Sequence, residues 1–222
     1  MIPLRDVIPS RTAPYITVLI IVLNALAWLL ELSLPPNDLL AFLQTFGVVP
    51  AHFWWPTIVT SMFLHGGWMH VIGNMWYLWI FGDNVEDRLG HRRFIVFYLV
   101  CGTTAALGQT LVDPTSTLPT IGASGAIAGV MGAYFVLYPR ARVLTLVPLI
   151  IFWQIIELPA ILLLGFWFVM QLFSAGAIAV TAATHGSGGV AFAAHVAGFL
   201  VGIAWGFILK KSKRREEWWA GR

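Results

Sequence analysis

Four polar residues lie within otherwise apolar segments of this sequence, and their types are those of an acyl-transfer site. His70 and Asn74 are four positions apart in WMHVIGNMWYLW, so on a helix they would share one face. Ser124 lies in IGASGAIAGVMGAY and His195 in GGVAFAAHVAGFLVG. A serine is a weak nucleophile until a neighbouring base removes its proton, a task that histidine performs most often. Additional hydrogen-bond donors would stabilise the oxyanion that the attack creates.

Each of these residues, taken alone, also has a structural interpretation. His70 and Asn74 could form a buried pair that bridges two helices, and Ser124 could be a small residue at a helix contact. His195 could be a hydrogen-bonded core residue or a proton relay. The choice between chemistry and packing therefore depends on where the surrounding elements place the four side chains.

Composition indicates a membrane protein. Of the 222 residues, 59% are hydrophobic and 10% are charged, and the mean hydropathy is +0.81. A soluble domain carries about 25% charged residues, so this chain could not cover a globular surface. The net charge of +3 does not lie on a soluble face, which argues against a nucleic-acid partner. The single cysteine allows no intramolecular disulfide, and no metal, haem or dinucleotide motif occurs, so we expect no metal and no cofactor.

Apolar segments of membrane-spanning character predict an all-α membrane protein with six helices. Their approximate ranges are 15–34, 68–82, 94–112, 121–138, 158–180 and 190–209. The stretch 35–67 is rich in tryptophan and interrupted by prolines, so we expect short helices that lie in the outer leaflet. The apolar segment 143–156 is short for a span and contains Pro148, so we interpret it as re-entrant or interfacial.

Positive charges support this arrangement. With six spans, all thirteen Lys and Arg residues fall on the side of the N-terminus. The opposite loops contain none of them: 35–67, 113–120 and 181–189. The positive-inside rule then predicts cytoplasmic termini in a cell (inner) membrane, with a cytoplasmic segment 1–14. The basic tail 210–222 would be a cytoplasmic anchor at the inner headgroups. A seventh span at 143–156 would move that tail outside.

The same topology brings the polar residues to one depth. Ser124 is in the first turn of its helix and His195 is near the start of the last helix, and both helices begin outside. At a rise of about 1.5 Å per residue, the side chains of Ser124 and His195 lie in the outer part of the bilayer. The helix that carries His70 near its start enters the bilayer from the same side. Small residues would let these two helices approach closely. They are Gly125, Gly129 and Gly132 on the first helix and Gly198 and Gly202 on the second.

The ordered motifs resemble a known family. HGGWMHVIGN, VEDRLG, GASG and AHVAGF occur in the order and spacing typical of the rhomboid intramembrane serine proteases. The resemblance covers roughly residues 50–209, and the ordered set is far more specific than any one motif. It implies a six-helix rhomboid-like bundle over 15–209, with a membrane-embedded first loop and a Ser–His dyad in place of a triad.

The resemblance also implies a role for each matching residue. Ser124 matches the nucleophile and His195 the base, while His70 and Asn74 match residues that assist the oxyanion. The glycine before the nucleophile corresponds to Gly122.

Further matches concern the backbone and the framework. The backbone at Ala123, where the helix starts, would add N–H donors for the oxyanion. Glu86 and Arg88 match an ExR pair that is structural in the family. Trp167 and Gln171 lie on the helix that matches the proposed lateral substrate gate.

Two features depart from the family pattern. The first loop carries WWPT where many members have a Trp-Arg motif. Ala128 occupies the position where some members have a tyrosine that stacks on the catalytic histidine, so His195 must be held in another way. Asp113 is the nearest outer-loop acid, and we do not count it as a third catalytic member.

The combined interpretation is a serine endopeptidase that cleaves transmembrane segments of membrane proteins near the outer face, through an acyl-enzyme. One alternative is a catalytically silent rhomboid-like binding or quality-control protein, although such proteins usually lack the serine or the histidine, and both are present. Another is a small transporter with a polar path, although the inner halves of the helices lack matching polar residues and no inverted repeat is visible. The sequence leaves the oligomeric state open.

Overall fold

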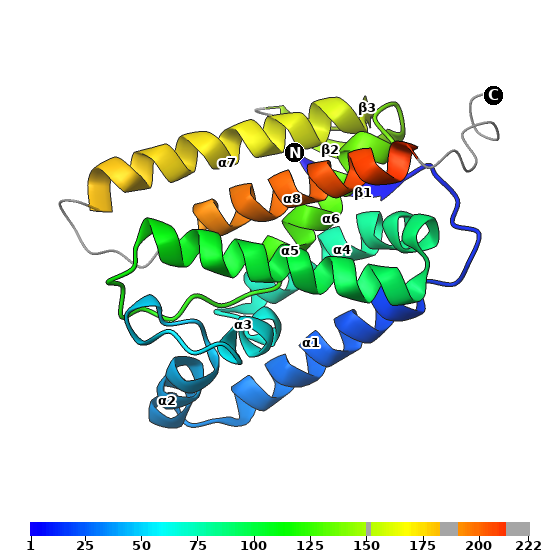
Figure 1. Cartoon of the computed structure of the whole chain (residues 1–222). Coiled ribbons are helices and arrows are strands. Elements are labelled where there is room, and N and C mark those ends of the chain that lie inside the picture. The colour runs from blue at the N-terminus through cyan, green and yellow to red at the C-terminus, as the bar shows by residue number, and fades with distance from the viewer. Residues whose placement is uncertain (150–151, 183–190, 212–222) are drawn as a thin grey trace.

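Long helices make up most of the structure, a computed structural model that describes residues 1–149, 152–182 and 191–211 (Figure 1). They are α1 (Tyr15–Ser33), α4 (Trp68–Leu89), α5 (His91–Val112), α6 (Ser124–Leu137), α7 (Ala160–Ala182) and α8 (Phe192–Lys211). Each begins within a few residues of a predicted segment. The helix α4 continues past the predicted end at residue 82, because the more polar stretch DNVEDRL stays helical up to Gly90.

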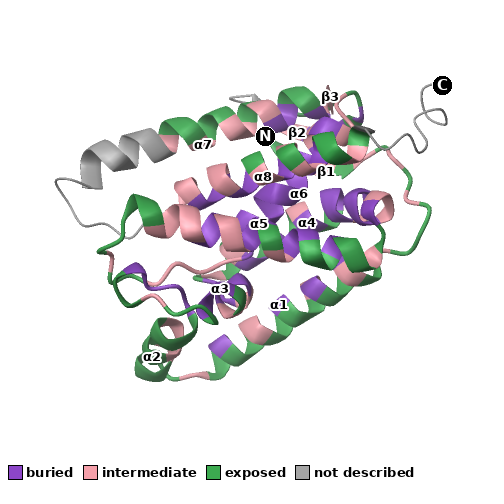
Figure 2. Cartoon of the chain, in the orientation of Figure 1, coloured by how far each residue is buried: buried purple, intermediate pink, exposed green. Residues whose placement is uncertain are grey.

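Three of these helices are long and apolar enough to cross a membrane, judged by length and composition. They are α1, α5 and α8 over Phe192–Lys210. The helix α6 and the part Ala160–Ser174 of α7 are shorter apolar helices. The outward faces of α1 and α7 carry many exposed apolar side chains, whereas the buried residues gather around α6 (Figure 2). An exposed apolar surface of this extent suits lipid rather than water.

The segment between α1 and α4 folds into short helices, as predicted. These are α2 (Pro36–Phe46), α3 (Thr57–Thr60) and two 3-10 helices, Pro50–His52 and Ser61–Phe63. The segment also holds the chain that leads into α6. Val48 and Thr120 exchange backbone hydrogen bonds of 3.1 and 2.8 Å, and the N–H of Gly122 donates to the carbonyl of Ser61 at 2.8 Å. The first loop therefore fixes the entry to the helix that begins with the serine.

The helix α6 is the centre of the bundle and contacts α4, α5, α7 and α8. Every residue from Gly125 to Tyr134 is buried. The tightest contact is with α8, where a Cβ added to Gly198 or Gly202 would lie 2.0 or 1.9 Å from a carbonyl oxygen of α6. Only glycine allows the two backbones to come this close.

The three glycines of α6 lie at the contact with α8, as predicted, and two of them also face α5. A Cβ on Gly125 would lie 2.4 Å from the side chain of Ala105, and one on Gly129 would lie 2.4 Å from Cys101, so both face α5 first. The glycines of α8 rest instead on the carbonyl oxygens of these two residues. In a helix the carbonyl and the Cβ of one residue point in different directions, so each glycine of α6 serves two neighbours.

A small antiparallel sheet, which the sequence did not predict, lies at one end of the bundle. Its strands are β1 (Ile2–Asp6), β2 (Arg142–Leu149) and β3 (Phe152–Pro159), in the order β1-β2-β3. Ile2 pairs with Leu146, and Arg142 pairs with Pro159. Apart from residues 150 and 151, which lie outside the described ranges, the segment 143–156 forms the two paired strands of a hairpin. Its re-entrant or interfacial position relative to the membrane stays a prediction. The all-α prediction holds for the bundle but not for this sheet.

Two residues of the VEDRLG motif hold helix ends together. The buried carboxylate of Glu86 accepts the backbone N–H groups of Ile16 and Thr17, at 2.9 and 2.7 Å. These groups belong to the first turn of α1 and would otherwise lack an intrahelical acceptor. Arg88 donates to the carbonyl of Leu209 near the end of α8, at 3.5 Å. A cation next to the last carbonyls of a helix is favourable, so both contacts are structural.

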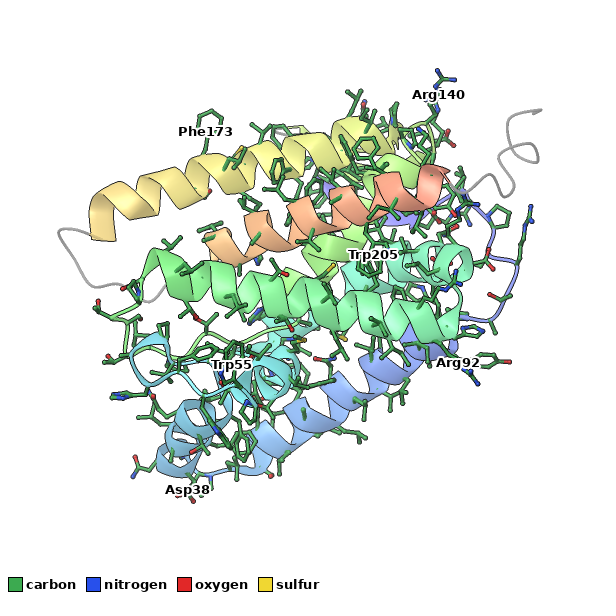
Figure 3. All side chains as sticks on the ribbon, in the orientation of Figure 1. Asp38, Trp55, Arg92, Arg140, Phe173 and Trp205 are labelled. Atoms are coloured by element: carbon green, nitrogen blue, oxygen red, sulfur yellow. The ribbon has the colours of Figure 1, made fainter. Side chains whose placement is uncertain are left out.

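Asp6 attaches the sheet to the bundle. Its carboxylate accepts hydrogen bonds from the hydroxyl of Tyr134 at 2.5 Å and from the side chain of Asn84 at 3.0 Å. Burial raises the pKa of Asp6 to about 7; the nearby carboxylate of Asp83 adds to this effect, and the Tyr134 hydroxyl opposes it. Charges at the two ends of the bundle also differ: Arg92 and Arg140 lie toward one end and Asp38 toward the other (Figure 3).

The raised pKa of Asp6 predicts a pH-dependent stability. Between its ordinary value of 3.8 and the folded value of about 7, the folded protein binds more protons than the unfolded chain. The stabilising contribution is therefore complete below the lower value and is lost as pH rises through the upper one. We expect Tm in detergent to fall as pH rises from about 4 to about 7, and to fall less in Asp6→Asn, which keeps an acceptor for Tyr134. Equal slopes in the two proteins would contradict this assignment.

The contact between α6 and α8 predicts a strong effect of one methyl group. In Gly202→Ala the new Cβ would lie 1.9 Å from the carbonyl oxygen of Gly129, so the helices must separate. We expect a loss of about 1–3 kcal/mol or more in the free energy of unfolding in mixed micelles. Gly165→Ala is the matched control, since its Cβ would make only an ordinary contact of 3.6 Å with Phe135. A control as destabilised as Gly202→Ala would exclude this explanation.

Candidate active site

Ser124 is the first residue of the central helix. The chain reaches it through Gly122, whose φ of +121° is in the region that favours glycine, and through Ala123, the N-cap. No side chain caps this end of α6, so N–H groups of its first turn remain available to a negative charge.

Ser124 and His195 contact each other where α6 packs against α8. The Nε2 atom of His195 lies 2.7 Å from the Oγ atom of Ser124, which is hydrogen-bond distance. His195 is in the first turn of α8, is 8% exposed, and donates its backbone N–H to Ala191. The close contact between the glycines of the two helices therefore brings an imidazole to a hydroxyl group.

The other side of the His195 ring is held by α7. The Nδ1 atom lies 2.7 Å from Oε1 of Gln171. The rings of Trp167 and His195 have centroids 5.8 Å apart with an interplanar angle of 37°. The structure thus shows what holds the ring when Ala128 replaces a stacking aromatic. From the sequence, Gln171 was placed on the helix that matches the proposed gate, but its contact with His195 was not predicted. A polar amide within an apolar helix was the signal that could have indicated this contact.

His70 and Asn74 lie beside Gly122, as members of α4. The N–H of Gly66 donates to Nδ1 of His70 at 3.3 Å, which leaves the proton of the neutral ring on Nε2. A Cβ on Gly122 would lie 2.7 Å from that Nε2 and 3.7 Å from Nδ2 of Asn74. Within the described residues, Nδ2 of Asn74 is buried and has no hydrogen-bond partner. Buried donors are rarely left unpaired, so this position is suited to an acceptor supplied by a ligand.

His65, a neighbour of His70, and Glu31, which accepts the backbone N–H of His65, were not identified from the sequence. The ring of His65 lies 5.0 Å from that of His70, and its backbone N–H donates to both carboxylate oxygens of Glu31, at 3.1 and 3.2 Å. Burial, with a smaller effect of His70, lowers the pKa of His65 to about 4, so this ring is neutral at pH 7. The acid within the apolar segment 15–34 was the signal that could have revealed the pair.

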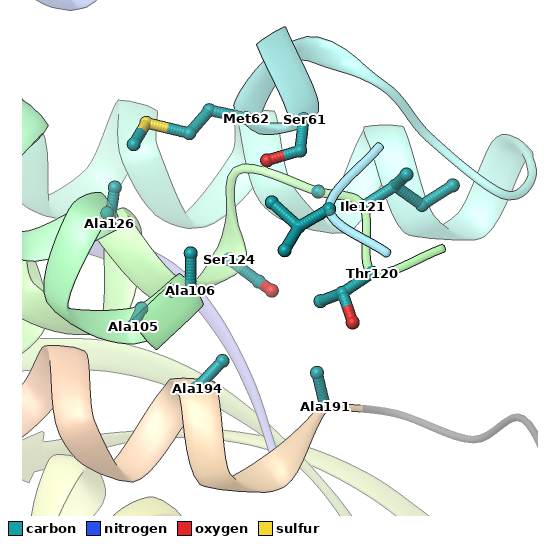
Figure 4. Close-up of a pocket in the computed structure, with 14 residues that line it drawn as sticks. Ser61, Met62, Ala105, Ala106, Thr120, Ile121, Ser124, Ala126, Ala191 and Ala194 are labelled. Atoms are coloured by element: carbon teal, nitrogen blue, oxygen red, sulfur yellow. The ribbon is translucent and has the colours of Figure 1, made fainter. Parts of the chain in front are cut away.

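A small pocket adjoins the serine hydroxyl (Figure 4). Its walls are mainly small residues from the first loop, α5, α6 and the start of α8. The labelled members include Ser61, Thr120, Ser124, Ala191 and Ala194. The cavity has a volume of about 30 Å³, which is enough for a water molecule. A serine hydroxyl, an imidazole, side-chain N–H donors and room for a water molecule therefore lie together.

Comparison with known proteins identifies the family of this chain. The Rhomboid domain family matches residues 51–212. YdcA of Bacillus subtilis, a candidate rhomboid protease, is 31% identical over 129 residues, which cover 56% of this chain and 62% of YdcA. Rhomboid-like protein 11, chloroplastic, of Arabidopsis thaliana is 27% identical over 198 residues, 85% of this chain and 66% of that protein.

A parasite protein is similar over a shorter share of its own length. Rhomboid-like protease 5 of Toxoplasma gondii is 31% identical over 166 residues, which cover 72% of this chain and 17% of that protein. This chain thus matches at most about two thirds of the length of these three relatives. Because the family match spans most of the chain and the helices are apolar, this is an integral membrane protein of the rhomboid family, whose members are generally intramembrane serine proteases.

Proposed function

We propose that this protein is an intramembrane serine endopeptidase in which Ser124 is the nucleophile and His195 is the general base. The observation that carries the proposal is the 2.7 Å contact between Oγ of Ser124 and Nε2 of His195. A base must lie within hydrogen-bond reach of the proton that it removes. The family comparison adds that related chains are named proteases.

The proposed reaction has two halves. In the first, Nε2 of His195 takes the proton of Ser124 while Oγ attacks the carbonyl carbon of the scissile peptide. The tetrahedral intermediate collapses, the C–N bond breaks, and the imidazolium gives its proton to the leaving amine. In the second half, His195 takes a proton from water, whose oxygen attacks the acyl-enzyme. The ester bond breaks, Ser124 regains a proton, and the new carboxyl end is released.

The oxyanion of each intermediate needs donors that are already in place. We assign this role to the Nε2–H of His70 and the Nδ2–H of Asn74, together with backbone N–H groups near Ala123. The buried and unpartnered Nδ2 of Asn74 supports the assignment. Gly122 has no side chain, which leaves the two side-chain donors open toward the start of α6.

The substrate would be a transmembrane segment of another membrane protein, which enters from lipid and unwinds locally. A helical backbone keeps its carbonyls in hydrogen bonds, so helix-weakening residues near the cleavage site would favour attack. We place the site near the outer face, the first loop in the outer leaflet and the membrane domain over 15–209. Both termini, the segment 1–14 and the tail 210–222, would be cytoplasmic. The tail beyond residue 211 and the loop 183–190 lie outside the described residues.

Replacement of the nucleophile provides the first test. We expect Ser124→Ala to abolish cleavage of labelled transmembrane segments by the detergent-purified protein, and to abolish covalent labelling by a fluorophosphonate probe. Ser33→Ala is the matched control, because that hydroxyl is exposed and bonds only to the carbonyl of Leu30 in its own helix. Cleavage by Ser124→Ala at the wild-type rate would overturn the proposal, and a wild-type protein that neither cleaves nor reacts would favour the silent alternative.

A second test concerns the space in front of the oxyanion donors. In Gly122→Ala the positive φ is strained, and the added Cβ would lie 2.7 Å from Nε2 of His70. We expect a loss of roughly 10²–10³ in kcat, comparable to removal of one oxyanion donor. The control Gly73→Ala adds a Cβ with nothing within 4 Å, one residue before Asn74. Full activity in Gly122→Ala would show that these donors do not face the reacting carbonyl.

A further inference from the structure

The contact between Gln171 and His195 connects two helices that have different tasks. In the described residues both ring nitrogens of His195 have a partner at 2.7 Å: Nε2 contacts Ser124 of α6, and Nδ1 contacts Oε1 of Gln171 of α7. The imidazole is thus held at both ends, by two helices that pack against α8 from different sides.

The chemistry of this contact selects a tautomer. The amide oxygen of Gln171 can only accept, so Nδ1 of a neutral His195 must carry the proton. Nε2 then presents a lone pair to the hydroxyl of Ser124, which is the form a general base requires. The opposite tautomer would place a proton on Nε2 and could not deprotonate the serine.

The described surroundings of the ring offer no second polar contact on this side. Ala128 is fully buried and provides no stacking surface. The aromatic neighbours are Trp167, at 5.8 Å and 37°, and Phe192, at 6.2 Å and 84°. Trp167 and Gln171 are four positions apart on α7, so they lie on one face of that helix. The orientation of the base therefore depends on how α7 packs against α8.

From these contacts we infer that Gln171 is a positioning residue, which fixes the tautomer and orientation of His195 and makes the reactivity of Ser124 depend on the position of α7. The inference rests on the proposed function, in which His195 is the base. If α7 moves away from α8, Nδ1 loses its acceptor and the ring is free to turn. When α7 returns, the hydrogen bond restores the productive form. The same helix can thus admit a substrate and restore the base.

The test compares two variants of Gln171 with a control on the same helix. Gln171→Met keeps the length of the side chain and removes the acceptor, whereas Gln171→Glu keeps an acceptor for Nδ1–H. Phe173→Ala is the control, because that side chain is 72% exposed and points away from the bundle (Figure 3). We expect Gln171→Met to lower kcat and the rate of fluorophosphonate labelling by roughly 10–100-fold, the effect of losing one strong buried hydrogen bond. KM should stay unchanged, and Gln171→Glu should recover most of the rate.

A spectroscopic readout separates this inference from the proposed function. In protein labelled with ¹⁵N-histidine, the His195 signals, identified by their absence in His195→Ala, should show one tautomer with the proton on Nδ1. In Gln171→Met we expect a mixture of tautomers, with an unchanged Tm that excludes general unfolding. A single unchanged tautomer in Gln171→Met, or a rise in KM with unchanged kcat, would overturn the inference. Correct tautomer shifts in a wild-type protein without cleavage would leave the positioning intact and reject the protease.

Discussion

The close approach of α8 to α6 is the constraint on which the rest of the structure depends. Gly198 and Gly202 rest on carbonyl oxygens of α6 at a distance that a methyl group would prevent. In lipid, apolar side chains gain little by meeting each other, so helix association relies on such packing. The same contact brings Nε2 of His195 within 2.7 Å of Ser124. The packing that stabilises the bundle therefore also sets the distance between Ser124 and His195.

The two ends of the bundle satisfy their polar groups differently. At the end with the sheet, Glu86 accepts the first N–H groups of α1, and Asp6 accepts a hydroxyl and an amide from α6 and α4. At the other end, Nδ2 of Asn74 is a buried donor without a partner among the described residues. A buried donor without a partner is costly. In the proposed function, this donor would be filled by the oxyanion of the substrate.

Much of the fold could be predicted from the sequence, and the errors have identifiable causes. Long apolar segments predicted the helix ranges, because helix formation and membrane burial are properties of one continuous segment. The sheet was missed because β1 pairs with β2, which lies far away in the sequence. An apolar segment such as RVLTLVPL does not show with which other strand it will pair. The four polar residues were found because polar groups are rare in lipid-facing helices. The contact of Gln171 with His195 was missed, because it depends on how α7 packs against α8.

A neutral partner for His195 fits its surroundings. A carboxylate at the position of Gln171 would hold the ring more strongly, but it would bring a charge into a site among apolar helices, where desolvation is expensive. An amide oxygen selects the same tautomer at much lower cost, and it attracts the imidazolium less strongly. This would give the proposed dyad a physical reason to do without an acid. It also explains why Ala128 can be small: the orientation that a stacking ring supplies elsewhere comes here from α7, through a hydrogen bond and the nearby ring of Trp167.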